Sequence, residues 1–145
     1  MGIRDFQSLR ARLDDIRQDA ADAGIRASKR AALAAHAVLV SETRIDTSNA
    51  RSNWIVSTGA PSDEQRGPFV PGVGGSTLAP STSAALDDGR DRIDAARPGE
   101  TIFIAQGINA PYIPFITPPV ARAVSEGVRA ARATRVVRVT GASDG

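Results

Sequence analysis

The chain has 145 residues, the usual size of one domain, and it contains no cysteine, which excludes disulfides and thiolate metal sites. Hydrophobic residues make up 41% of it, but many of them are alanines, which bury little area. We therefore expect a thin core and a need for partner surfaces.

The charge is nearly balanced overall, at +2, but it is uneven along the chain. Residues 101–143 hold five arginines, which face nucleic acid or an acidic partner or form a solvated helix face. No apolar run approaches the ~20 residues of a membrane-spanning helix. The first residues also lack the apolar centre of a signal peptide. We expect a soluble, unexported protein with no membrane partner.

Residues 3–23 are predicted to form a helix, because apolar residues recur at steps of three and four. These residues are Phe6, Leu9, Leu13, Ile16 and Ala20. Gly24 breaks or only weakens the pattern, which resumes at Ile25 and continues to about Thr43. Two helices and one bent helix both fit. A single helix of about 40 residues would be roughly 60 Å long, too long for a compact domain of this size unless part of it packs on a neighbouring subunit.

Residues 46–61 are predicted to form a turn and a strand. Asp46 and Thr47 are capping residues that can stop the helix or start a short turn. In the segment NWIVSTG that follows, Trp54 and Val56 share one face of the strand. We expect Trp54, the single tryptophan, to pack back under the preceding helix and to anchor the sheet.

Residues 62–80 are predicted to form a long loop, since they are rich in Gly, Pro and Ser. A loop of this length in a small domain is usually functional or disordered. It nevertheless carries apolar side chains that a solvated linker would not need. We expect the loop to be mobile in the free subunit and to become ordered against a neighbouring one. Its assembly-interface candidates are Phe69, Val70, Val73 and Leu78.

Residues 81–140 are predicted to form a helix, a strand and a last helix. The helix at 81–96 would be capped by Ser81 or Ser83 and weakened by Gly89, and the strand would be TIFIAQ, at 101–106. Prolines suit the first turn of a helix, so the last helix is expected to begin at Pro118 and Pro119. Its buried stripe would comprise Val120, Val124, Val128 and Ala131. RVVRVT, at 135–140, could add a short closing strand.

These elements predict one α+β domain over residues 1–145. A helical arm at 1–45, one long helix or a helix pair, would precede a small mixed or antiparallel sheet. Two further helices would pack on that sheet.

The residues that catalysis needs are missing or scattered. Hydrolysis and group transfer require a nucleophile with a base, or a bound metal. His36 is the single histidine, and a lone helical histidine is more typical of a packed or surface position. The glycine-rich PGVGGST lacks the lysine and the preceding strand of a phosphate-binding loop. We predict that the protein is not an enzyme and has no catalytic residue, cofactor or metal site.

Two signatures resemble those of the neck or tail-completion proteins of long-tailed bacteriophages, also called head–tail joining proteins. The first comprises Asp46, Thr47, Arg51, Asn53 and Trp54. The second joins the strand at 101–104 to Asn109 and Tyr112. The resemblance extends in outline over residues 25–135. The family's glycine after Asp-Thr is Ser48 here, and IPFITPP replaces the turn that follows the family's tyrosine.

The resemblance implies a structural virion protein without cofactors, made in the host cytoplasm and located in the virion neck. Its expected partners are further copies of itself, in a ring of six-fold symmetry, and the adjoining connector and tail proteins. Genomic DNA would pass through the ring non-specifically, and Arg122, Arg129 and Arg132 could face that DNA or a partner. The alternatives are a tail terminator of the same neck and a small basic nucleic-acid-binding protein.

Overall fold

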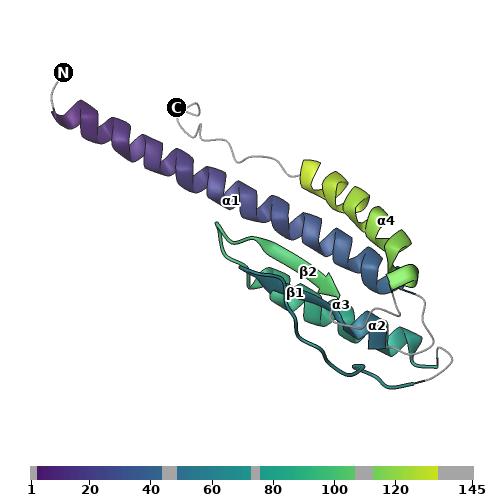
Figure 1. The fold of residues 1–145 in the computed structure, drawn as a ribbon. Coiled ribbons are helices and arrows are strands. Elements are labelled where there is room, and N and C mark those ends of the chain that lie inside the picture. The colour runs from purple at the N-terminus through teal and green to yellow at the C-terminus, as the bar shows by residue number, and fades with distance from the viewer. Residues whose placement is uncertain (1–2, 44–48, 73–75, 107–112, 134–145) are drawn as a thin grey trace.

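The computed structural model describes residues 3–43, 49–72, 76–106 and 113–133, and Figure 1 shows their arrangement. Helices dominate, and two short strands form the sheet. The elements in chain order are α1 (Ile3–Glu42), α2 (Asn49–Ser52), β1 (Trp54–Thr58), α3 (Leu78–Asp94), β2 (Ile102–Gln106) and α4 (Ile113–Arg132). The predicted α+β class, with a long N-terminal helix and a small sheet, is confirmed.

The sheet is an antiparallel pair in which Trp54 lies opposite Gln106 and Val56 opposite Ile104. A reversal follows β1 at Gly59, whose φ of 84° lies in the left-handed region that favours glycine. The Gly59 N–H then donates to the Thr101 carbonyl at 3.2 Å, which extends the pairing by one bond beyond the ladder.

The N-terminal region is one continuous helix of 40 residues, which decides between the two predicted arrangements. Gly24 lies inside it, and a Cβ at that position would meet nothing within 4 Å. The C-terminal half of α1 packs against α3, α4 and the sheet, whereas every side chain from residue 5 to residue 18 is exposed. The N-terminal half therefore projects from the body as an arm, as Figure 1 shows at its purple end.

The core is thin, as the alanine content predicts. One cluster gathers Leu39, Val40, Trp54, Ala85 and Ala123, where α1, β1, α3 and α4 meet. A second, smaller cluster joins Ala32 of α1, Val56 of β1 and Ile93 of α3. Apolar area buried from water drives folding, and a core this small buries little of it.

Helix α3 begins at Leu78 after Thr77, earlier than the predicted start at residue 81. Ser81 is not the cap but a fully buried residue inside the helix. Residues 78–80, which were predicted to belong to the loop, form the first turn of α3. Gly89, predicted to weaken this helix, lies where α3 crosses α1. A Cβ at that position would be 2.2 Å from Cε1 of His36.

The last helix begins at Ile113, upstream of the predicted start at Pro118. Its predicted buried stripe is also wrong: Val120, Val124 and Val128 are exposed, Val124 by 62%. The buried positions are instead small, and a Cβ on Gly127 would lie only 3.2 Å from the Ala31 carbonyl oxygen. Small residues let α4 approach α1 closely, and this close packing leaves the valines on a free face.

The possible strand at 135–140 lies outside the described residues. Across the described part of the chain, no helix is sufficiently long and apolar to cross a membrane.

Candidate functional site

Trp54 sits at the junction of α1 and β1 and is 4% exposed. Its indole Nε1–H donates to the Thr43 hydroxyl at 2.8 Å, just beyond the end of α1. That hydroxyl in turn donates to the Leu39 carbonyl one turn earlier. The ring packs against Leu39 and Val40. The prediction that Trp54 packs under the helix is therefore confirmed, and Thr43 is the partner that pattern reasoning missed.

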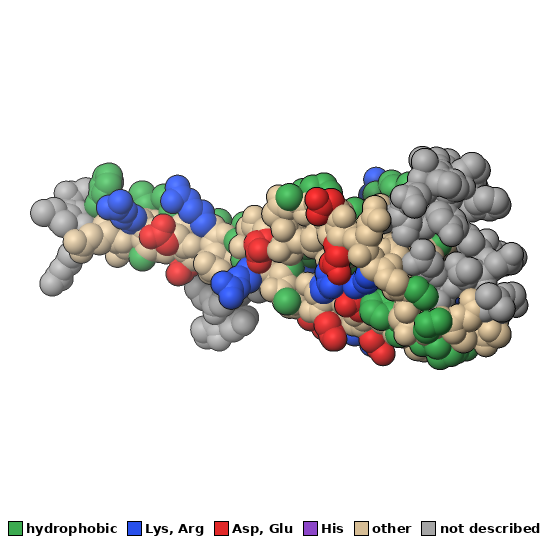
Figure 2. Space-filling view, turned by 60° about the horizontal axis from the view of Figure 1, so that its bottom comes forward, with side chains coloured by type: hydrophobic (Ala, Val, Ile, Leu, Met, Phe, Trp, Pro, Cys, Tyr) green, Lys and Arg blue, Asp and Glu red, His purple; other side chains and the backbone are tan. Residues whose placement is uncertain are grey.

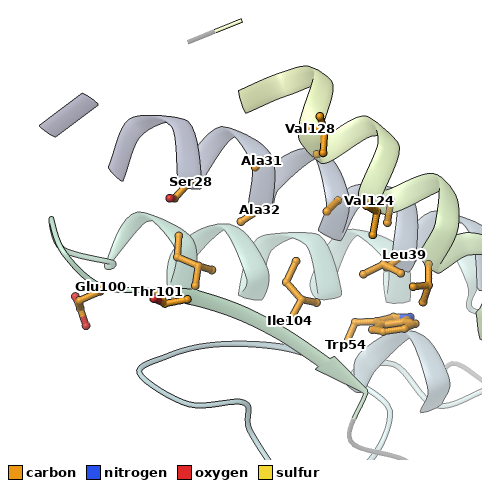
Figure 3. A pocket seen from close by; sticks show the side chains of 15 residues that line it. Ser28, Ala31, Ala32, Leu39, Trp54, Glu100, Thr101, Ile104, Val124 and Val128 are labelled. Carbon is orange, nitrogen blue, oxygen red and sulfur yellow. The ribbon is translucent and has the colours of Figure 1, made fainter. Parts of the chain in front are cut away.

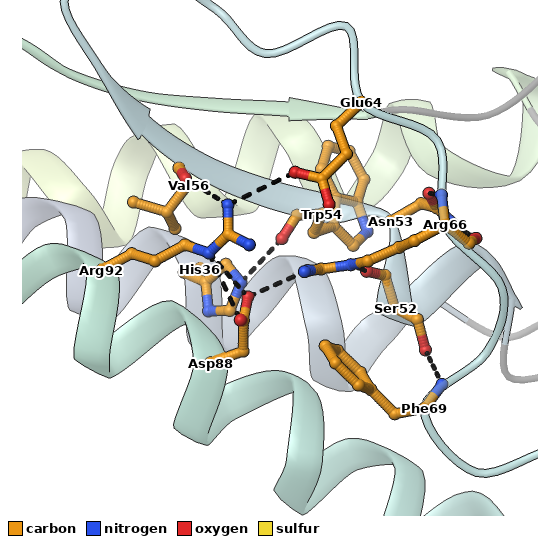
Figure 4. Close-up of polar contacts among 10 residues, drawn as sticks. All are labelled: His36, Ser52, Asn53, Trp54, Val56, Glu64, Arg66, Phe69, Asp88 and Arg92. Carbon is orange, nitrogen blue, oxygen red and sulfur yellow. Dashed lines mark hydrogen bonds and ion pairs between the residues drawn. The ribbon is translucent and has the colours of Figure 1, made fainter.

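His36 occupies the other side of this junction and is 2% exposed. Its Nε2 lies 3.0 Å from the Trp54 carbonyl oxygen, which can only accept, so Nε2 carries the proton. Burial lowers the pKa of His36 from its ordinary 6.5, against smaller raising effects from that carbonyl and from Asp88. The ring is thus neutral near pH 7, and it fills the space between α1 and α3 (Figure 4).

A polar anchor fixes the first part of the loop after β1. Asn53, fully buried, donates through Nδ2 to the Arg66 carbonyl at 2.7 Å and accepts the Arg66 N–H at 3.0 Å. The Ser52 hydroxyl accepts the Phe69 N–H at 2.9 Å. Figure 4 shows Arg66 reaching over this region towards α3. The backbone of the loop is therefore bonded to the body at residues 66 and 69.

Charged side chains extend this anchor to α3. Arg66 Nη2 lies 2.9 Å from Asp88 Oδ2, with both side chains largely shielded from solvent. Arg92 pairs with Asp88 at 3.3 Å and with Glu64 at 3.5 Å. The signs alternate through Glu64, Arg92, Asp88 and Arg66, so each charge has an opposite neighbour. Such a chain of pairs ties the loop to α3.

The loop was expected to be mobile in the free subunit and to become ordered against a neighbouring one, but its backbone is bonded to the chain's own body at residues 66 and 69. Its Gly and Pro content predicted mobility, but Ser52, Asn53 and Asp88 supply partners that lie far away in sequence. Among the interface candidates, Phe69 lies beneath the Arg66 guanidinium, whose Cζ is 4.5 Å from the centroid of the Phe69 ring, and Phe69 is 37% exposed. Val70 is half-buried, Leu78 is exposed at the start of α3, and Val73 lies outside the described residues.

An apolar groove opens between α4 and β2, with α1 as its floor (Figure 3). Its volume is about 520 Å³. Small residues of α1, Ala31 and Ala32 among them, form the floor, while Val124 and Val128 of α4 face Ile104 of β2 across it. Glu100 and Thr101 stand at one end. The groove is apolar and exposed because Val120, Val124 and Val128, which were expected to be buried, line it instead.

The projecting arm carries a second apolar surface. The stripe predicted from sequence is present and uncovered, with Phe6 76% exposed and Ile16 47% exposed. Figure 2 shows hydrophobic side chains beside charged ones along this part of the molecule, at the left of the view. Soluble proteins seldom leave large apolar side chains aligned in water unless the surface has a partner.

The candidate basic face is exposed, as expected. Arg122 pairs with Glu42 at the end of α1, and Arg129 lies 3.3 Å from Glu126, both at solvent-accessible positions. Arg132, in the last turn of α4, is exposed as well. Within the described ranges, no three His, Cys, Asp or Glu residues come together in a way that could hold a metal ion.

The residues that carry the family resemblance divide into two groups. Arg51, Asn53 and Trp54 lie together and are buried, and Arg51 donates to the Thr82 hydroxyl of α3 at 2.8 Å. Asp46, Thr47, Asn109 and Tyr112 lie outside the described residues. Comparison of the chain with protein-family models, curated proteins and solved structures finds no match.

Proposed function

We propose that this protein is a structural subunit of the neck of a long-tailed phage, forming a ring that joins the head to the tail and leaves a channel for DNA. The observation that carries the proposal is the pair of uncovered apolar surfaces, the arm stripe and the groove. A chain with a thin core and two such surfaces has the character of one part of a larger assembly.

The sequence resemblance supplies the kind of assembly. Arg51, Asn53 and Trp54, three of the positions that carry it, support the junction between α1, β1 and α3. Their burial supports the proposal, since a family signature of a structural protein is expected at positions that determine the fold. An enzyme's signature would instead be expected to line an open site.

A gene deletion in a phage that carries this sequence tests the proposal. We expect filled heads and free tails of normal length, which do not join until the wild-type protein is supplied. Labelled antibody should bind at the head–tail junction of intact particles in electron micrographs. Tails of abnormal length would identify a tail terminator instead, and normal infectious particles would overturn both assignments.

A second function, nucleic-acid binding, is favoured by one observation, the exposed Arg122, Arg129 and Arg132 on α4. For a neck subunit we expect weak binding to duplex DNA that falls steeply with added salt, because it depends on counterion release. Binding at physiological salt that distinguishes one duplex sequence from another would favour the nucleic-acid role over the neck.

A further inference from the structure

The arm of α1 lacks the contacts that stabilise a helix in water. Isolated helices of this length are marginal, and most helical stability in proteins comes from packing of an apolar face. Four large side chains of one stripe, Phe6, Leu9, Leu13 and Ile16, are exposed along it. The other half of α1 is already covered by α3, α4 and the sheet. The arm therefore needs a partner that its own body does not provide, because it points away from that body (Figure 1).

The groove between α4 and β2 has a shape that suits a row of large apolar side chains. Its floor is lined by alanines of α1, so it has room for large side chains, and its walls are aliphatic. Figure 3 shows Val124 and Val128 on one wall and Ile104 on the other. Large side chains against a floor of small ones is the arrangement that lets two surfaces interdigitate at high density.

The two surfaces agree in length, and the arm carries arginines that an acidic residue at the groove could meet. From Phe6 to Ile16 the stripe rises about 15 Å, and from Val120 to Val128 the groove wall rises about 12 Å, at 1.5 Å per residue. Both signs of charge lie beside the stripe: Arg10 and Arg17 are three and four residues from Leu13, and Arg17 pairs with Asp14 at 3.7 Å in an exposed ion pair. Glu100 stands at the end of the groove, where one of these arginines would find an opposite charge.

We propose that the arm of one copy binds in the groove between α4 and β2 of a second copy. The contact is heterologous, because it joins two different surfaces of the same chain. It leaves the arm of the second copy and the groove of the first free, so copies add head to tail and either close into a ring or continue as a filament. This inference does not depend on the phage-neck proposal.

Two single substitutions separate the surfaces without touching the core. Leu13→Glu places a charge on the exposed arm stripe, and Val124→Glu places one on the exposed groove wall. Ala11→Glu on the opposite side of the arm and Ser125→Glu on α4 are matched controls, both at exposed positions. Circular dichroism and melting curves verify that all four variants remain folded. Light scattering then gives the mass of each protein over a range of concentrations.

Wild-type protein and both controls are expected to assemble beyond a dimer, whereas each stripe or groove variant alone stays monomeric. Mixed at equal concentration, Leu13→Glu and Val124→Glu should form one-to-one dimers and nothing larger, because one intact groove meets one intact arm. Pairing between two arms predicts that Val124→Glu still self-associates, which would overturn the proposal. Monomeric wild type at all concentrations, or variants that never complement each other, would overturn it too.

Discussion

At the scale of single residues, Trp54 is the centre of the junction that the sequence signature marks. The indole is buried against Leu39 and Val40 and donates to Thr43. We predict that Trp54→Ala lowers the free energy of unfolding by about 3 to 5 kcal/mol, as truncation of a buried aromatic commonly does. Urea unfolding measures this loss. Trp54→Phe, which keeps a ring but loses the N–H, should cost clearly less. Indole fluorescence characteristic of water exposure in the folded protein would contradict the burial.

His36 makes the stability of the fold depend on pH in a defined direction. Its pKa is lowered in the folded state by burial, so below pH 6.5 the unfolded chain binds a proton more readily than the folded one. Stability is therefore complete above pH 6.5 and is lost as pH falls from there towards the folded-state pKa. The slope can reach about 1.4 kcal/mol per pH unit.

Denaturant unfolding at pH 7 and pH 5.5 checks this prediction, since Asp and Glu ionise mostly below that window. The chain has a single histidine, so the histidine-free variant His36→Gln should show a nearly flat profile between these values. An equal slope in the wild type and in this variant would place the effect elsewhere.

At the scale of elements, glycines define how closely the helices pack. We predict that Gly89→Ala costs about 1 to 3 kcal/mol, because the added methyl would overpack against the buried His36 ring. Gly24→Ala is the matched control, since Gly24 is exposed inside α1 with open space around it. That change should stabilise the helix by about 0.5 to 1 kcal/mol. Thermal melts measure both, and equal effects at the two sites would contradict the α1–α3 crossing.

The polar anchor of the loop gives a second prediction for an element. We expect Asn53→Ala to cost about 1 to 3 kcal/mol, because it removes the side-chain partner of two half-buried backbone groups of Arg66. It should also make the loop after β1 a preferred site of limited proteolysis. Arg90→Ala is the control, since Arg90 and Asp87 form a solvent-exposed pair worth little. Unchanged proteolysis in Asn53→Ala would mean that other bonds hold the loop.

Sequence reasoning identified most elements but misjudged the face that α4 buries. Periodicity located the stripes of α1 and α4, yet a repeat of apolar residues does not state what covers it. In α4 the packing face consists of Ala123 and Gly127, residues with little hydrophobic signal, so the valines were assigned to the interior. The loop anchor was missed for a related reason. Its partners, Asn53 and Asp88, lie in separate elements, and no local pattern reports their meeting with Arg66.

At the scale of the whole molecule, the distribution of apolar surface explains why a body this small carries a helix of 40 residues. Such a helix is too long for a compact domain of this size, and its N-terminal half projects from the body. Arm and groove on one chain allow copies to join by a single repeated contact, which is the simplest way to build a ring. A neck ring would use this contact for its geometry and leave a central passage for DNA.

Cryo-electron microscopy of the neck of a phage that encodes this chain tests the account most directly. We predict a closed ring of this fold at the head–tail junction, with the α1 arm of each subunit lying between α4 and β2 of its neighbour. A neck that contains no density for this fold would contradict the function. A ring whose arms leave that groove empty would contradict the mode of assembly.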